Sequence, residues 1–156
     1  MKALLSTYGY GSVREPNEGL RLGVARHVPR GVRREDWQRR NYFDLWLPLL
    51  APTSELVAKY KGGEISFAVF SRRYRSQMKA AESRQVIELL ATVSLVQPIS
   101  IGCFCEDESR CHRSLLQKLL LEAAKGKASG LLSQSDSTSG ESVRFASPVC
   151  FASDQE

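Results

Sequence analysis

The chain has 156 residues and a mass of 17.4 kDa, which is the size of one ordinary domain. Hydrophobic residues make up 42% of it and charged residues 25%, so wholesale disorder, collagen and coiled coil are excluded. The net charge of +5 favours an anionic partner, either a small molecule or nucleic acid. No apolar run reaches the roughly 18–20 residues that a membrane helix needs, and the start of the chain does not resemble a signal peptide. We therefore expect a cytoplasmic protein with no membrane partner.

The first predicted elements are two short strands joined by turns. Residues 3–8 predict a buried strand, and Leu20–Arg26 predict a second one. The link between them fits either a hairpin or a short parallel crossover, and the sequence does not choose between the two. The first strand runs into Gly9 and Gly11, and glycines allow the backbone to approach a ligand closely. Tyr8 and Gly9 are therefore predicted to contribute to substrate binding.

Helices are predicted for most of the remaining chain. Thr53 followed by an acid marks the start of a helix that ends near Tyr60. An apolar stripe with helical spacing predicts another helix near 65–78; its members are Phe67, Phe70, Tyr74 and Met78. The other predicted elements are a short helix from Arg34, a helix over Ser83–Val96, a strand over Ile99–Cys103 and a helix over Ser109–Lys125 that ends at Gly126. This order predicts an α/β fold, a single compact domain in which helices flank a small, mostly parallel sheet.

The composition changes near the C-terminus. Residues 1–128 are assigned to the α/β domain, and residues 129–142, rich in serine, to a linker or loop. Residues 143–156 are assigned to a candidate edge strand over Val143–Phe151 and a flexible end.

Basic residues gather in two places. Residues 21–40 contain seven arginines against Glu35 and Asp36 only; these are Arg21, Arg26, Arg30, Arg33, Arg34, Arg39 and Arg40. The predicted helix near 65–78 carries a second basic face of Arg72, Arg75 and Lys79. The planar guanidinium group binds phosphate and carboxylate in a bidentate manner. Such faces are either simply solvated or follow the phosphates of a nucleic acid.

Three of the four cysteines lie close together, at Cys103, Cys105 and Cys111. They follow a buried strand and precede a helix, and the carboxyl ends of strands are where α/β proteins bind ligands. Cys111, His112 and Arg113 fall in the first turn of the predicted helix, where free N–H groups and neighbouring cations lower the pKa of a thiol. The segment therefore has the properties of a reactive-cysteine site.

Three interpretations of the cysteines stay open. In the first, Cys105 or Cys111 is a nucleophile and His112 transfers protons. In the second, Cys103, Cys105, Cys111 and His112 bind zinc, although adjacent Cys and His residues are unfavourable for one tetrahedral site. In the third, the thiols only pack or form a redox pair, and Cys103 in particular faces the core.

The order of motifs resembles the domain-of-unknown-function 488 (DUF488) family over roughly residues 3–125. The matching segments are Arg26 with Pro29-Arg30-Gly31, Leu50–Leu56, Phe70–Tyr74, Cys105-Glu106-Asp107 and Cys111-His112-Arg113. The resemblance implies a compact α/β domain whose cysteine motifs suggest an enzyme of unsettled reaction. His27-Val28 departs from the apolar-aromatic pair expected before the proline, which bears on substrate choice.

We therefore predict an enzyme-like pocket for an anionic, phosphate-bearing substrate, with a nucleotide or the phosphate of a nucleic acid as the leading candidate. The activity class that fits this pocket is a thiol-dependent hydrolase or transferase. Cys105, Cys111, His112 and Arg113 are the predicted catalytic residues. The predicted substrate-binding residues are Arg26, Arg30, Tyr8 and Gly9. This prediction requires Arg26, Arg30 and Arg113 to line the same pocket as the thiols. No cofactor or metal ligand is assigned. The alternatives are a basic nucleic-acid-binding module without catalysis and a zinc-binding or thiol redox domain.

Overall fold

Four parallel strands form the centre of the molecule. The computed structural model describes residues 2–132. In it, strands β1 (Leu5–Gly9), β2 (Leu20–Gly23), β3 (Leu45–Trp46) and β4 (Ile99–Cys103) form one sheet in the order β1-β4-β2-β3. Every neighbouring pair is parallel. β1 and β2 are thus neither a hairpin nor neighbours, because β4 lies between them.

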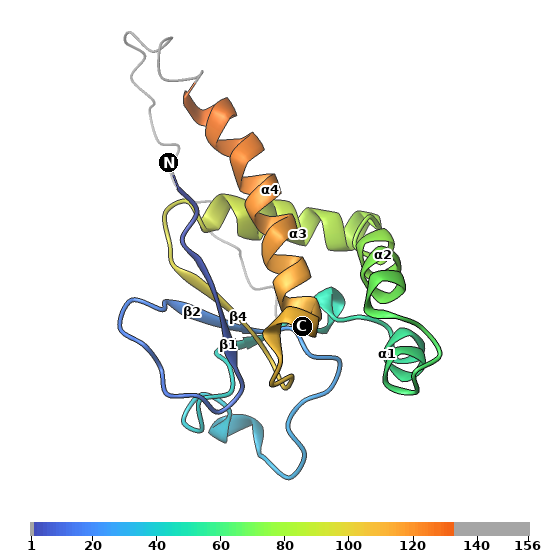
Figure 1. Cartoon of the computed structure of the whole chain (residues 1–156). Helices are drawn as coiled ribbons and strands as arrows, with labels where there is room; N and C mark the ends of the chain where they lie inside the picture. Colours follow the sequence, from blue (N-terminus) through green and yellow to red (C-terminus); the bar gives the residue numbers. More distant parts are fainter. Residues whose placement is uncertain (1, 133–156) are drawn as a thin grey trace, which may run out of the picture.

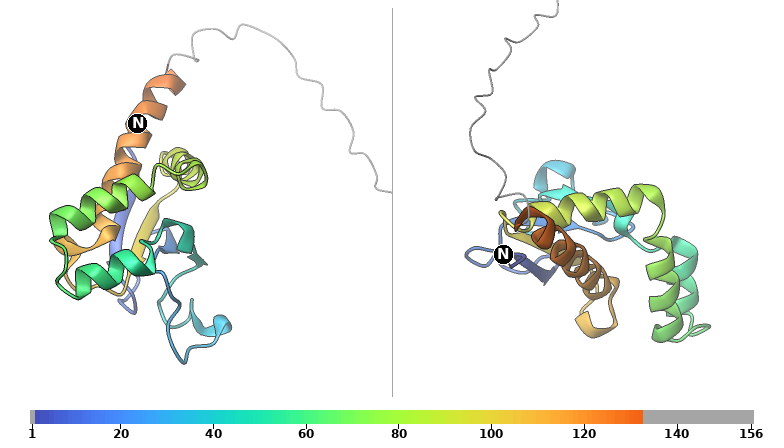
Figure 2. Two further views of the ribbon diagram at one scale, coloured as in Figure 1. Left: turned by 90° about the vertical axis from the view of Figure 1, so that its right-hand side faces the viewer. Right: turned by 90° about the horizontal axis from the view of Figure 1, so that it is seen from above.

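Helices cover one side of this sheet (Figures 1 and 2). α4 (His112–Leu132) lies against β1 and β4, and α3 (Ala81–Val93) packs against α4. α1 (Ser54–Lys61) and α2 (Phe67–Gln77) pack against each other at the side of the molecule seen at the right of Figure 1. Short 3-10 helices occupy Arg34–Asp36, Pro48–Leu50 and Glu108–Arg110. The predicted α/β fold with a parallel sheet is confirmed.

The core lies between the sheet and the helices. The predicted apolar stripe of α2 is directed into this core, where Phe70, Tyr74 and Met78 are buried. Leu116 and Leu120 of α4 meet the buried isoleucines of β4 there. Within residues 2–132, no helix is both long and apolar enough to cross a membrane.

The opposite side of the sheet is polar and is covered by loops. Arg21 of β2 is completely buried there, and its guanidinium carbon lies 4.2 Å from the centre of the Tyr8 ring. It donates two hydrogen bonds to the carboxylate of Glu18, at 3.1 and 2.8 Å. Arg21 was counted with the basic stretch in the sequence, but it belongs to the interior and offers no charge to a ligand.

The last helix differs from its prediction at both ends. α4 begins at His112 rather than Ser109, because residues Glu108–Arg110 form a separate 3-10 turn and Cys111 is extended. It passes through Gly126 and ends at Leu132, four residues into the predicted linker. Glycine lowers helix stability by roughly 1 kcal/mol, which does not end a helix by itself. The rest of the predicted linker and the candidate strand Val143–Phe151 lie outside the described residues.

Candidate functional site

The cysteine loop and the end of β2 meet at the carboxyl edge of the sheet. β4 ends at Cys103, and β2 ends beside it at Gly23, so the backbone of Val24 and Ala25 lies next to the cysteine loop. Cys111 has an extended backbone (φ −118°, ψ 145°) immediately before α4, whereas His112 is the first helical residue. This change of conformation lets two adjacent side chains turn to the same place.

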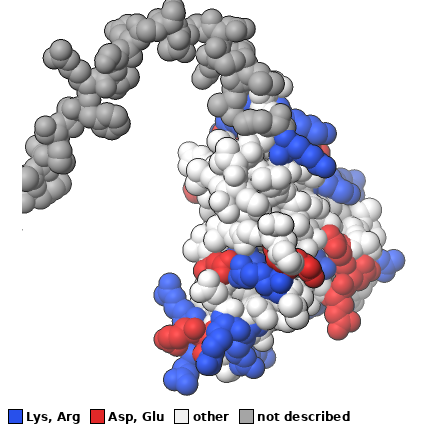
Figure 3. All heavy atoms as spheres, turned by 90° about the vertical axis from the view of Figure 1, so that its left-hand side faces the viewer, with Lys and Arg blue, Asp and Glu red and all other residues white. Residues whose placement is uncertain are grey.

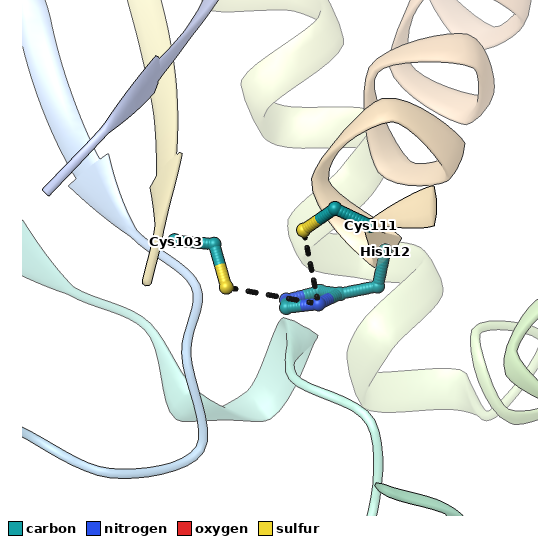
Figure 4. A group of neighbouring side chains, drawn as sticks. All are labelled: Cys103, Cys111 and His112. Atoms are coloured by element: carbon teal, nitrogen blue, oxygen red, sulfur yellow. Dashed lines mark hydrogen bonds between the residues drawn. The ribbon is translucent and has the colours of Figure 1, made fainter. Parts of the chain in front are cut away.

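His112 is held with one ring nitrogen facing the thiols (Figure 4). Its Nε2 lies 2.8 Å from the carbonyl oxygen of Val24. Because a carbonyl oxygen only accepts, Nε2 carries the proton and Nδ1 holds the lone pair. Nδ1 is 3.8 Å from Cys111 Sγ and 4.0 Å from Cys103 Sγ. Burial lowers the pKa of His112, so the neutral ring is the favoured form.

The three thiols share contacts that make them unequal. Cys103 Sγ lies 3.7 Å from Cys105 Sγ, and Cys105 is half-buried while Cys103 and Cys111 are buried. Hydrogen bonds from Cys103 and Cys111 lower the pKa of the Cys105 thiol, and the positive charge of Arg113 acts in the same direction. The same contacts raise the pKa of Cys103 and Cys111. The first negative charge of the cluster therefore falls on its most accessible sulfur.

A cavity of about 190 Å³ opens over this cluster. Its floor contains Cys103, Cys105, Cys111 and His112, and its walls are largely apolar, formed by Ala25, Pro52, Val57, Tyr60, Phe70 and Phe104. The charged side chains around it are cations, Arg26, Lys61 and Arg110, with His27 beside them. Among the described residues that line it there is no carboxylate.

Arg26 reaches this cavity from the loop after β2. Its Nε donates to the Pro52 carbonyl at 3.0 Å, and its Nη2 donates to the Ala51 carbonyl at 2.8 Å. These bonds fix the guanidinium between the β2 loop and the start of α1. Its Nη1 has no protein partner among residues 2–132 and remains available to a ligand.

The structure brings together only part of the predicted site. Cys105, Cys111, His112 and Arg26 line the cavity, whereas Arg113 does not. The Arg113 side chain is buried behind the loop, and its Nη1 donates to the carbonyls of Tyr8 and Cys105, each at 3.0 Å. Arg113 therefore positions the cysteine loop instead of facing a ligand.

The remaining predicted substrate-binding residues also lie away from the cavity. The Tyr8 hydroxyl donates to the Tyr42 carbonyl at 2.6 Å, on the polar side of the sheet. Gly9 lies beside the Arg113 guanidinium, and Arg30 is exposed without lining the cavity. Of the three arginines that were expected to line one pocket with the thiols, only Arg26 does so. Arg113 is turned away because the backbone carbonyls of Tyr8 and Cys105 accept its hydrogen bonds.

Several lining residues were missed by sequence reasoning. Cys103 was expected to face the core; it is buried and also forms part of the floor. Tyr60 and Val57 of α1 form walls, and Lys61 and Arg110 lie at the rim. The apolar stripe of α2 was the one available signal for the wall at Phe70, and it did not distinguish a cavity wall from ordinary core.

Comparison with known proteins identifies the family of this chain. A family model described as "Active DUF488-N3 subclade" matches residues 5–124. The molecule is thus an α/β domain with a cysteine–histidine cluster at the end of its central strand, and the chain belongs to the DUF488 family.

Two relatives are similar over most of their length, and both are uncharacterised. Uncharacterized protein YeaO of Escherichia coli (strain K12) is 26% identical over 102 residues, which cover 65% of this chain and 84% of that protein. Uncharacterized protein Rv3073c of Mycobacterium tuberculosis (strain H37Rv) is 28% identical over 106 residues, 68% of this chain and 84% of that protein. No solved structure matches the chain significantly.

Proposed function

We propose that the protein is an enzyme that binds a small anionic substrate in the cavity and acts on it with the sulfur of Cys105. One observation carries the proposal: a cavity whose floor is a thiol–imidazole cluster has only cations as its charged lining. The predicted phosphate-bearing substrate is compatible with this lining, because guanidinium and ammonium groups pair with phosphate oxygens.

The cavity also limits what the substrate is. Its volume of about 190 Å³ lies below the roughly 300–1,000 Å³ of pockets for drug-sized ligands. The walls from Pro52, Tyr60, Phe70 and Phe104 suit an apolar or flat aromatic body. A small phosphate ester, or the phosphate end of a single nucleotide, fits these limits better than a folded nucleic acid.

The roles of the residues follow from their positions. Cys105 is the accessible sulfur, and it attacks the electrophilic centre while the leaving group departs with the electron pair of the broken bond. Water or an acceptor molecule then takes the group from sulfur, which corresponds to a hydrolase or a transferase. Arg26 holds the anion, and Arg113 keeps the loop carbonyl of Cys105 in place.

The test is alkylation of the full chain by iodoacetamide, with each cysteine followed by mass spectrometry. We expect Cys105 to react faster than Cys103 and Cys111, and inorganic phosphate or a nucleoside monophosphate to slow its reaction. Arg26→Gln should weaken this protection about 10-fold or more, because hydrogen bonds to charged groups contribute about 1.5–3 kcal/mol. Arg33→Gln, an exposed arginine that does not line the cavity, is the matched control. Equal reactivity of all cysteines, or protection that survives Arg26→Gln, contradicts the proposal.

A second candidate function, nucleic-acid binding without catalysis, is favoured by the exposed loop of residues 30–40. Arg30, Arg33, Arg34, Arg39 and Arg40 are all exposed there, and basic side chains cluster at the lower end of the face shown in Figure 3. This loop projects from the sheet away from α2, so it does not continue into the basic face of that helix (Figure 2). Binding of single-stranded RNA or DNA that weakens with salt and is unchanged by Cys105→Ser supports this alternative.

A further inference from the structure

The geometry points to a metal site: Cys103, Cys111 and Nδ1 of His112 hold one divalent ion of the zinc class, and its fourth position is left for a ligand in the cavity. The three donor atoms lie within 4.8 Å of one another, and all three residues are buried. This inference concerns the floor of the cavity described above and does not require the proposed anionic substrate.

The separations between the donors are close to those of a tetrahedral zinc site. With Zn–S of about 2.3 Å and Zn–N of about 2.0–2.1 Å, sulfur and nitrogen ligands lie about 3.5 Å apart. The two observed S···N separations are 3.8 and 4.0 Å. Each S···N separation is thus within about 0.5 Å of the value in a zinc site, and small rotations of the side chains would shorten it.

The histidine is already arranged as a ligand. Metal-binding histidines usually donate their other ring N–H to a carbonyl or carboxylate, which fixes the ring. The bond from Nε2 to the Val24 carbonyl, at 2.8 Å, does this and directs the lone pair of Nδ1 at the two sulfurs. Adjacent residues such as Cys111 and His112 are unfavourable ligands for one tetrahedral site when both lie in regular structure. Here the backbone of Cys111 is extended, so its side chain and that of His112 can reach the same ion.

Charge and ligand type favour zinc. Two thiolates and one neutral imidazole bring a total charge of −2, which one divalent ion neutralises inside a buried site. Each ligating thiol releases its proton to water when the metal binds. Thiolate and imidazole donors together are typical of zinc, and a set of two cysteines and one histidine leaves a fourth position open.

Cys105 is not one of the three ligands in this assignment. Its sulfur lies 3.7 Å from that of Cys103 and lines the cavity, but it is outside the group in which all the donor atoms approach one another. A bound ion would therefore lie next to Cys105. In that position it would polarise an oxygen atom of a ligand in the cavity.

The experiment uses the full chain, purified without chelator and under reducing conditions, with zinc measured by elemental analysis. We expect about one zinc ion per chain. The chain stripped of metal should then bind Co²⁺ with thiolate-to-cobalt absorption in the near ultraviolet and intense tetrahedral bands in the visible. Less than a tenth of an equivalent of zinc, together with a cobalt spectrum lacking thiolate bands, overturns the inference.

Variants identify the ligands. Cys111→Ser and His112→Ala should each weaken cobalt binding at least 10-fold, whereas Cys105→Ser and Cys150→Ser should retain the stoichiometry and the thiolate bands. Loss of binding in Cys105→Ser overturns the three-ligand assignment. The spectrum of the unaltered chain decides the question where a variant fails to fold, as judged by circular dichroism. Phosphate protection measured on the metal-free chain tests the proposed function separately, so the two can fail independently.

Discussion

Replacement of Arg21 by methionine should destabilise the protein severely, although the sequence places this arginine in a basic stretch suited to binding anions. The guanidinium has no exposure to solvent, and all five of its N–H donors are used. Two bonds go to Glu18, and three go to the carbonyls of Ser12, Asn41 and Val13 at 2.9–3.0 Å.

The magnitude follows from what the substitution leaves behind. Glu18 has a side-chain exposure of only 6%. Arg21→Met therefore leaves a nearly buried carboxylate and three carbonyl groups without the N–H donors of the guanidinium. Breaking a buried ion pair by removing one partner costs about 3–5 kcal/mol. Arg21→Lys should recover little of this, because an ammonium group has three donors and cannot reproduce the planar arrangement.

The assay is urea denaturation followed by circular dichroism, with a double-mutant cycle through Glu18→Met. The double variant should lose about 1–3 kcal/mol less than the sum of the single variants, because it leaves no unpaired charge. Arg39→Met is the control, since its side chain is 78% exposed in the pair with Asp36 and should have little effect. A loss below about 1 kcal/mol for Arg21→Met, or additive single effects, would refute the reasoning.

Two further predictions concern other polar contacts. Tyr74→Phe should lower the free energy of unfolding by about 1–3 kcal/mol, since the buried Leu50 carbonyl loses its 2.7 Å partner; an equal loss in Tyr60→Phe, on a half-buried side chain, would contradict this. Burial alone would raise the pKa of Asp44, but bonds from Arg14 and the backbone N–H of Arg21 lower it below its usual value. The stabilisation is therefore present above the unfolded pKa of about 3.9 and is lost as the pH falls through the folded value. In urea titrations from pH 7 to pH 3, the advantage of the wild type over Asp44→Asn should shrink; a constant advantage would refute the assignment.

The sequence was informative where a local pattern determines the structure. The spacing of four apolar residues, Phe67, Phe70, Tyr74 and Met78, predicted a buried helix face. The last three are buried in the core, and Phe67 is partly buried against it. The apolar strand ending at Cys103 was predicted with the bounds that β4 has. Short-range periodicity decides both features, since side-chain burial on a helix or strand repeats within a few residues.

Long-range partners were beyond the reach of the sequence. Arg113 looked like an anion-binding residue, but its partners are the backbone carbonyls of Tyr8 and Cys105. A main-chain carbonyl has no residue-specific signal, so nothing in the sequence marks it as the partner. The position of β4 between β1 and β2 is likewise a property of the whole sheet. Arg26 lines the same cavity as the thiols, because the carboxyl ends of parallel strands meet at one edge.

The bond between His112 and Val24 spans 88 positions of the chain. Every sulfur and nitrogen of the cluster comes from the short segment between Cys103 and His112, yet the group that aims the imidazole belongs to the loop after β2. A peptide copied from this segment, or the same letters grafted onto a foreign scaffold, would carry the reactive atoms without their alignment. The alignment of this cluster is therefore a property of the assembled sheet, and a search for its motif alone would retrieve sequences in which the same residues are not aligned.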